Sequence, residues 1–346
     1  RAGLVALPLN FRLVSDELGY ILKDAQVSAL ICAQALQDKV LPIVGQLPLK
    51  ACVQMDGVLM AGWTDYDALI QQAPERHDWP HVDPKQTCAL MYTSGTTGAP
   101  KGVMITHDMM LRTAFGSTWG RAFQDAHRIL FSLPMYHVYG YVEGLLACLF
   151  VGGAIIPQTR FDAIETLQAI ENHKATDVLL IPTMTLALLD ELKKTDYALS
   201  SLTHVISSGG RAPAYIWQDI VKYLHPQEIT TGYGMTEVTA SSTVTQPTDN
   251  QDRWLHTNGR LRDVGPAGDA ALGNRLVIYR VVDPETGHEL SYGQVGELQA
   301  KGPGVTSGYY NKPNETAAAF TSDGWLHTGD LGRIDKEDYI CLVGRL

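Results

Sequence analysis

The segment YTSGTTGAPKG, from Tyr92 to Gly102, places glycines and small hydroxyl residues directly before one lysine. Glycine lets the backbone turn its N–H groups inward, the hydroxyls offer further donors, and Lys101 adds a full positive charge. The segment therefore predicts a phosphate-binding loop. A Walker loop needs the pattern G-x-x-x-x-G-K-[ST], but here Gly95 and Gly98 are too close together, and two residues separate Gly98 from Lys101. The NTPase form of the loop is disfavoured.

The surrounding sequence predicts the elements that must hold this loop. We expect a strand over Cys88 to Tyr92 before it and a helix from about His107 after it. The same order of strand, loop and helix is expected to recur after four further apolar segments: 129–132, 178–181, 204–207 and 228–230. Apolar strands separated by helices indicate a parallel sheet covered on both faces, and ligands bind such sheets beyond the carboxyl ends of the strands.

The sequence before and after this region predicts two further units. Residues 1–84 are expected to form a partial first α/β subdomain, with a strand over 4–7, a helix capped by Ser15 and a strand over 29–32. A proline-punctuated connector closes it, and its His77, Asp78, His81 and Asp83 are interpreted as a solvated loop rather than a metal cluster. Residues 85–263 form the predicted α/β nucleotide- and acyl-binding subdomain. Short alternating stretches with Gly, Pro, Asn and Asp turns predict a β-rich subdomain over 264–346.

Composition narrows the class of protein. The 346 residues are 45% hydrophobic with a formal net charge of -10, which argues against a nucleic-acid partner or an anionic membrane surface. The five cysteines form no C-x-x-C pair, so they indicate neither a disulfide framework nor a zinc site, and a reducing cytoplasm fits them best. The longest apolar run, 144–156, is too short to span a membrane and predicts a buried helix that turns into a strand.

The quoted loop, extended to TSGTTGAPKGV, resembles the phosphate-loop signature of the adenylate-forming superfamily. This superfamily contains acyl- and aryl-CoA synthetases, firefly luciferases and the adenylation domains of peptide synthetases. The resemblance implies their large-domain fold, with parallel-sheet βα subdomains and a C-terminal β-rich, distorted-barrel subdomain. It also implies that the phosphates of ATP are held by Lys101 and by the loop residues Thr93, Ser94, Gly95, Thr96, Thr97 and Gly98.

Two later segments resemble further signatures of the superfamily in the expected order. TGYGMTE, 231–237, resembles the motif in which the threonine contacts phosphate and the glutamate holds Mg²⁺, here Thr236 and Glu237. WLHTGDL, 325–331, resembles the segment whose aspartate accepts from both ribose hydroxyls, here Asp330. Arg345, in LVGR, matches an arginine that also approaches the ribose.

Two loops resemble the walls of the adenine and acyl pockets. In SSGGRAP, 207–213, Gly209 and Gly210 would let adenine approach the backbone, with Tyr233 stacked on its other face and Gly232 as a further cofactor-binding residue. Arg211 interrupts the usual pattern, and both a surface position and a ligand contact remain open for it. LPMYHVYG, 133–140, makes His137 a candidate pocket residue or gate, with a hydrogen-bonded core histidine as the alternative. The segment has no aspartate to hold a substrate amine, which favours an uncharged acyl or aryl acid.

The implied reaction is ATP-dependent activation of a fatty or aromatic acid to acyl-AMP, followed by thioester formation with coenzyme A. The implied catalytic set is Lys101, Thr236, Glu237 and His137, and the cofactors are ATP, Mg²⁺ and coenzyme A. Two alternatives stay open: an enzyme that loads a carrier protein, and a non-catalytic nucleotide-binding member of the fold. The abrupt ends of the sequence suggest that the start of the large domain and the small C-terminal domain are absent, so the chain alone is expected to bind nucleotide but adenylate poorly. The acid and the oligomeric state stay open.

Overall fold

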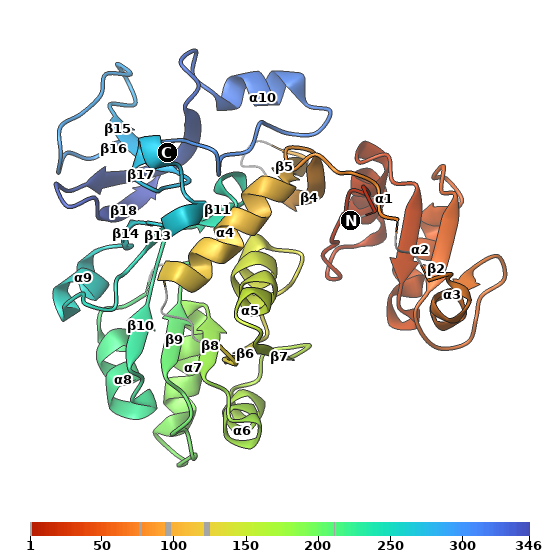
Figure 1. Cartoon of the computed structure of the whole chain (residues 1–346), viewed down its shortest axis with the longest axis horizontal. Coiled ribbons are helices and arrows are strands. Elements are labelled where there is room, and N and C mark those ends of the chain that lie inside the picture. The colour runs from red at the N-terminus through yellow and green to blue at the C-terminus, as the bar shows by residue number, and fades with distance from the viewer. Residues whose placement is uncertain (1, 76–77, 94–97, 121–124, 211) are drawn as a thin grey trace.

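The computed structural model describes residues 2–75, 78–93, 98–120, 125–210 and 212–346 (Figure 1). Its first unit is a three-stranded parallel sheet in the order β1-β2-β3 with short helices around it. The elements are α1 (Ser15–Asp24), β1 (Ala29–Cys32), η1 (Gln34–Leu36), α2 (Gln37–Val44), β2 (Ala51–Gln54), β3 (Thr64–Asp65) and α3 (Tyr66–Gln72).

Two local predictions for this unit are wrong. The strand expected over 4–7 is reduced to one parallel bridge between Ala6 and Ala89. Ser15 does not cap α1, because Val14 occupies the N-cap position. The Val14 N–H donates to the Glu17 carboxylate at 3.0 Å, so a first-turn glutamate satisfies the backbone donor of the N-cap residue. The connector is exposed at its described aspartates and at His81, as expected for a solvated loop, and His77 lies outside the described residues.

The predicted phosphate loop joins two antiparallel strands, not a strand and a helix. β4 (Thr87–Thr93) and β5 (Lys101–Thr106) form a hairpin in which Thr93 pairs with Lys101, and α4 (His107–Gly120) follows. Val103 and Ile105 are fully buried on β5, which explains why this segment forms a strand. The expectation that β4 belongs to the parallel sheet is therefore wrong.

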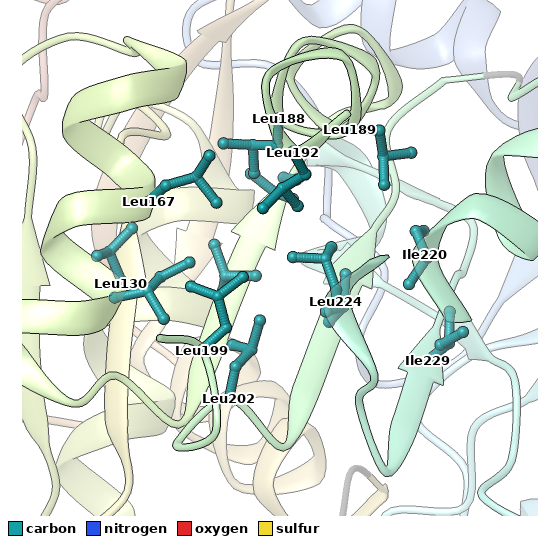
Figure 2. Close-up of a cluster of buried hydrophobic side chains, with 14 of the residues drawn as sticks. Leu130, Leu167, Leu188, Leu189, Leu192, Leu199, Leu202, Ile220, Leu224 and Ile229 are labelled. Atoms are coloured by element: carbon teal, nitrogen blue, oxygen red, sulfur yellow. The ribbon is translucent and has the colours of Figure 1, made fainter. Parts of the chain in front are cut away.

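The predicted parallel sheet is confirmed, with five strands in the order β10-β9-β8-β6-β7. Their bounds are β6 (Arg128–Phe131), β7 (Ala154–Pro157), β8 (Asp177–Leu180), β9 (His204–Ser207) and β10 (Glu228–Thr230). One face packs against α6 (Ala163–His173), α7 (Pro182–Leu192) and α8 (Tyr215–Leu224), and Figure 2 shows leucines and isoleucines of these helices meeting those of the strands.

The other face of the sheet is covered by the predicted apolar run. It forms a π-helical segment η2 (Tyr139–Leu146) that continues into α5 (Ala147–Phe150) and then turns into β7. Ile129, Phe131 and Leu179 of the sheet pack against Cys148 of α5. The expected helix that turns into a strand is thus confirmed, but it is buried on one side only, because Leu149 and Phe150 are exposed. In the part of the chain that the structure describes, no helix has the length and apolarity needed to cross a membrane.

The β-rich character predicted after residue 263 is also confirmed. β15 (Ile278–Val282), β16 (Gly296–Lys301), β17 (Leu326–Ile334) and β18 (Ile340–Arg345) form an antiparallel sheet in sequence order. Figure 1 shows it at the upper left, with the parallel sheet below. The chain between the two sheets forms η3 (Thr236–Val238), α9 (Gln251–His256), η4 (Gly265–Ala267), η5 (Ala270–Leu272) and the short strands β11 (Gly234–Met235), β12 (Ala240–Ser241), β13 (Thr243–Val244) and β14 (Arg260–Leu261); α10 (Pro313–Ala319) lies between β16 and β17.

Candidate active site

A cavity of about 800 Å³ lies where the carboxyl ends of β9 and β10 meet the β-rich sheet. Its walls come from the loops that follow these two strands, from the end of α9, and from β17 and β18. Among the predicted nucleotide residues it brings together Gly209, Gly210, Gly232, Tyr233, Asp330 and Arg345. The carboxyl-edge position predicted for the ligand is therefore where the structure has its large cavity.

Glycine is required at two positions of the cavity wall by backbone geometry. Gly209 has a φ of +84°, in the region that side-chain-bearing residues rarely adopt. A Cβ atom on Gly232 would lie 2.3 Å from the Thr243 carbonyl oxygen, so any larger residue would push apart two backbone segments. These glycines leave bare backbone facing the cavity, which suits close approach of a flat ring.

The two residues predicted to contact ribose are direct partners across two strands. Asp330 of β17 pairs with Arg345 of β18, and the Arg345 Nε lies 2.9 Å from Asp330 Oδ1. The Tyr233 hydroxyl donates to Asp330 Oδ2 at 2.7 Å. Asp330 is 4% exposed, whereas the Arg345 side chain is 66% exposed, so the carboxylate is fixed and the guanidinium can move.

Tyr233 is held by its neighbours on both sides. Its ring packs against Tyr279, with the ring centroids 5.9 Å apart. Burial, together with the nearby Tyr279 and the Asp330 carboxylate, raises the pKa of Tyr233 well above its ordinary value. The phenol therefore stays protonated and remains a hydrogen-bond donor to Asp330.

The residues predicted for phosphate and magnesium form a second group that does not line this cavity. Lys101 Nζ lies 4.3 Å from the centroid of the Tyr309 ring, and the Tyr309 hydroxyl donates to Glu237 Oε1 at 3.0 Å. Burial first, and then the Glu237 carboxylate, raises the pKa of Tyr309. Thr236 and Glu237 directly follow Gly234 and Met235, which do line the cavity, so the two groups are continuous along the chain.

Tyr309 was missed by the sequence analysis. It reaches Lys101 and Glu237 because it pairs with Val103 of β5 in an isolated antiparallel bridge. No local pattern marks it, since its position depends on the return of a segment about two hundred residues away.

The base of the phosphate-loop hairpin is fixed from outside by α1 and by the segment before α10. The Tyr92 hydroxyl donates to Asp24 at 2.7 Å, and Lys312 Nζ lies 2.5 Å from the same carboxylate. The Tyr20 hydroxyl donates to the Pro100 carbonyl oxygen at 3.2 Å. Thr93 and Gly98 flank the tip, whereas the predicted contacts Ser94, Gly95, Thr96 and Thr97 lie outside the described residues, as does Arg211.

His137 lies beside the cavity rather than in its wall. It is exposed, so the interpretation as a core histidine is wrong, while its neighbours Val138 and Tyr139 do line the cavity. Its ring lies 5.0 Å from the ring of Tyr136, centroid to centroid. The protein atoms around it reduce its hydration and lower the pKa of His137, which favours the neutral imidazole.

A cluster at the opposite edge of the parallel sheet was also missed. His127, Asp177 and His204 bring possible ligand atoms within 4.8 Å of one another. The available signal was a histidine or carboxylate at the start of several apolar strands, but only the strand order of the sheet brings these positions together.

The whole chain is similar to known proteins in sequence and in fold. The sequence model described as AMP-binding enzyme matches residues 1–310. The putative acyl-CoA synthetase YngI of Bacillus subtilis (strain 168) is 31% identical over 371 residues, which cover 100% of this chain and 65% of that protein. 4-Coumarate–CoA ligase 1 of Arabidopsis thaliana is 33% identical over 291 residues, covering 82% of this chain and 50% of the ligase.

Solved structures share the fold. ATP-bound MatB from Rhodopseudomonas palustris superposes with a TM-score of 0.86 at 28% identity, covering 100% of this chain and 64% of MatB. The chain thus spans less than two thirds of the length of these three proteins.

Proposed function

Since this chain belongs to the AMP-binding enzyme family, we propose that it activates a carboxylic acid with ATP to form an acyl adenylate, whose acyl group then passes to the thiol of coenzyme A. The observation that carries the proposal is the cavity at the carboxyl edge of the parallel sheet, which unites the glycine loops with the Asp330–Arg345 pair. The similarity to acyl-CoA and 4-coumarate–CoA ligases supports a fatty or aromatic acid as the substrate class.

The nucleoside half of ATP fits the cavity by its chemistry. Gly209 and Gly210 would approach one face of the adenine, with Gly232 and Tyr233 on the other. Asp330 would accept hydrogen bonds from the two ribose hydroxyls, because a carboxylate offers two oxygens to adjacent donors. Arg345, which is exposed, would swing from Asp330 toward the ribose.

The phosphates would be held by Lys101 and Thr236, with the loop residues Thr93 to Gly98 around them. Glu237 fits Mg²⁺ as a hard oxygen ligand: it is 7% exposed, Tyr309 donates to one of its oxygens, and no lysine or arginine among the described residues forms an ion pair with it. When bound, the ion would neutralise charge on the β- and γ-phosphates.

The chemical step brings together two anions, the carboxylate of the acid and the α-phosphate. Their repulsion at about 4 Å is roughly 4 kcal/mol at an effective dielectric constant near 20. Lys101 and the loop N–H groups would offset it by stabilising the pyrophosphate that leaves. His137, exposed beside the cavity, is proposed to guide the acid toward the α-phosphorus, which reduces the entropic part of the barrier. A reducing cytoplasm is the proposed compartment, because all five cysteines are free thiols.

The test uses the 346-residue chain in two assays. Calorimetry measures AMP and Mg-ATP binding, and mass spectrometry then detects acyl-AMP and acyl-CoA after incubation with Mg-ATP, coenzyme A and a panel of short, medium, long-chain and aromatic acids. We expect both nucleotides to bind and at least one acid to give its adenylate slowly. Asp330→Asn should weaken AMP, while the exposed Asp38→Asn should not. Absence of nucleotide binding by the folded wild type would contradict the proposal.

A further inference from the structure

Four polar side chains form a row across the amino-terminal edge of the parallel sheet, at the far end of the strands from the cavity. Glu228 of β10 is the register partner of His204 of β9, and His204 is the partner of Asp177 of β8. His127 directly precedes β6, the next strand in the sheet. Because partners in a parallel sheet point to the same face, the row places two imidazoles and two carboxylates side by side.

The contacts within the row have a clear order. His127 Nδ1 lies 3.0 Å from Asp177 Oδ2, and His204 Nδ1 lies 3.6 Å from Asp177 Oδ1. On the other side of the His204 ring, Nε2 lies 3.0 Å from Glu228 Oε2. Asp177 therefore stands between the two histidines, and Glu228 lies behind the second one.

The two carboxylates of this row are buried, so their negative charge needs compensation. Asp177 and Glu228 have side chains that are 0% and 5% exposed, and the two imidazoles are 11% exposed. Among the described residues, only the two imidazoles form ion pairs with these carboxylates, and Asp177 Oδ1 accepts no hydrogen bond. The Thr176 hydroxyl donates to Asp177 Oδ2, but a neutral donor does not cancel the charge of a buried carboxylate. Protons on the imidazoles or a bound cation would stabilise the two carboxylates.

We propose that Nδ1 of His127, Nδ1 of His204 and the Asp177 carboxylate bind one divalent transition-metal ion of the Zn²⁺ class. In tetrahedral zinc sites, neighbouring ligand atoms are about 3.3 Å apart for bonds of about 2.0 Å. His127 Nδ1 lies 3.0 Å from Asp177 Oδ2 and His204 Nδ1 lies 3.6 Å from Asp177 Oδ1, so each oxygen faces one imidazole at close to this separation. One ligand atom from each of the three residues lies within 4.8 Å of the others, so small side-chain rotations would bring them around one ion. Imidazole and carboxylate together suit Zn²⁺ and Co²⁺.

Glu228 prepares His204 to be a ligand. The Glu228 carboxylate would accept a hydrogen bond from the Nε2–H of His204. This bond fixes the tautomer of His204 whose lone pair is on Nδ1, the atom that faces Asp177. This arrangement of carboxylate, histidine and metal orients ligands in known metal sites. The Thr203 hydroxyl lies 2.8 Å from that Nδ1, and it would rotate away when the ion binds. The fourth ligand would be water, entering past the slightly exposed imidazoles.

The role of the ion would be structural. Its ligands join β6, β8 and β9, and Glu228 adds β10, so one ion would crosslink four neighbouring strands. Ligands of such sheets bind at the opposite, carboxyl edge, where the nucleotide cavity lies. Metal removal should therefore lower the melting temperature and leave AMP affinity unchanged.

The test begins with the wild-type chain after treatment with a chelator. Titration with Co²⁺ should show saturable uptake of one equivalent with the intense visible absorption of a four-coordinate ion, and Zn²⁺ should displace it. His127→Ala, His204→Ala and Asp177→Asn should each abolish this spectrum. Glu228→Gln should weaken binding about 10- to 100-fold, as expected for a residue that orients a ligand.

Two control variants separate this site from other metal ligands in the chain. The exposed His288→Ala and the proposed magnesium ligand variant Glu237→Gln should both retain the Co²⁺ spectrum and affinity. If the wild type takes up no Co²⁺ or Zn²⁺, the two carboxylates are neutralised by protons on the imidazoles and not by a metal ion. This result would overturn the proposal whether or not the variants fold. An equal loss of binding in His288→Ala and His204→Ala would overturn it as well.

Discussion

At the scale of single residues, Tyr309 keeps a cation and a carboxylate apart. Lys101 lies over its ring and Glu237 accepts from its hydroxyl, and no direct Lys101–Glu237 ion pair occurs among the described residues. A direct salt bridge would neutralise both groups. With the phenol between them, the ammonium remains available for phosphate and the carboxylate for a metal ion.

Lys101→Ala is expected to weaken ATP far more than AMP. Hydrogen bonds to charged groups contribute about 1.5–3 kcal/mol, so the dissociation constant of Mg-ATP should rise roughly 10- to 150-fold. AMP lacks the β- and γ-phosphates, so its dissociation constant should change by less than about threefold, which is within the usual variation of such contributions. Calorimetric titration of both nucleotides measures the ratio.

Lys50→Ala, which removes an exposed lysine of the first unit, serves as the matched control and should leave both affinities unchanged. Equal losses for ATP and AMP in the Lys101 variant would show that the lysine contacts another part of the nucleotide.

Contiguous signatures were enough to predict several residues that share the cavity, while their roles toward a nucleotide stay predictions. TGYGMTE and WLHTGDL each predicted residues that the structure brings to one cavity, Tyr233 and Asp330 among them. Tyr309 could not be predicted in this way, because its contacts depend on pairing between distant segments. The cluster of His127, Asp177 and His204 could not be predicted for the same reason, because the three residues become neighbours only through the order of the strands in the sheet.

At the scale of elements, a buried ion pair joins η2 to the segment after β14. Arg262 Nη1 lies 3.1 Å from Glu143 Oε1, and the two residues are 4% and 2% exposed. The same oxygen accepts from the Ser241 N–H at 3.1 Å, and the Ser117 hydroxyl of α4 donates to the other oxygen. Three elements are therefore fixed to one carboxylate beneath the cavity wall formed by Ser241.

Arg262→Met should lower the free energy of unfolding by roughly 3–5 kcal/mol, because it leaves a buried carboxylate without its charge partner. Adding Glu143→Gln should restore more than half of the loss, since glutamine keeps an acceptor for Ser241 without a net charge. Urea unfolding followed by circular dichroism measures both variants.

Arg160→Ala removes an exposed ion pair with Glu165 and should change the free energy of unfolding by less than about 1 kcal/mol. This variant is the control, because it also removes an arginine but leaves no buried charge behind. An additive double variant, no more stable than the sum of its single changes, would contradict this account of the pair.

Sequence patterns predicted the elements unevenly. The parallel strands were found because their apolar runs are buried on both faces, as Leu179 and Val205 are. β5 was missed because glycine and lysine at its start resemble the end of a loop, and only pairing with β4 shows it to be a strand. The cap of α1 was predicted wrongly because the helix begins one residue earlier than expected: Ser15 is already helical, Val14 is the N-cap, and Glu17 at the third helical position accepts from the Val14 N–H.

At the scale of the whole molecule, the cavity belongs to neither sheet alone. Gly209 and Thr231 extend from the parallel sheet, whereas Asp330 and Arg345 belong to the antiparallel one. Each sheet has a separate hydrophobic core, one around Leu188 and Ile220 and the other around Leu298 and Ile340. A ligand that contacts both walls would add a connection between the two cores.

AMP should therefore stabilise the chain as a unit. A ligand that binds only the folded state, at a concentration of 100 times its dissociation constant, raises the free energy of unfolding by about 2.7 kcal/mol. The melting temperature should rise with AMP concentration as this relation requires. Hydrogen exchange should slow in the loops after β9 and β10 and in β17 and β18 together, because the nucleotide closes both walls. Asp330→Asn should reduce both effects, and Asp38→Asn should leave them intact. Protection confined to the loops of the parallel sheet would show that the nucleotide rests on one wall only, and that the Asp330–Arg345 pair serves the β-rich sheet rather than the ribose.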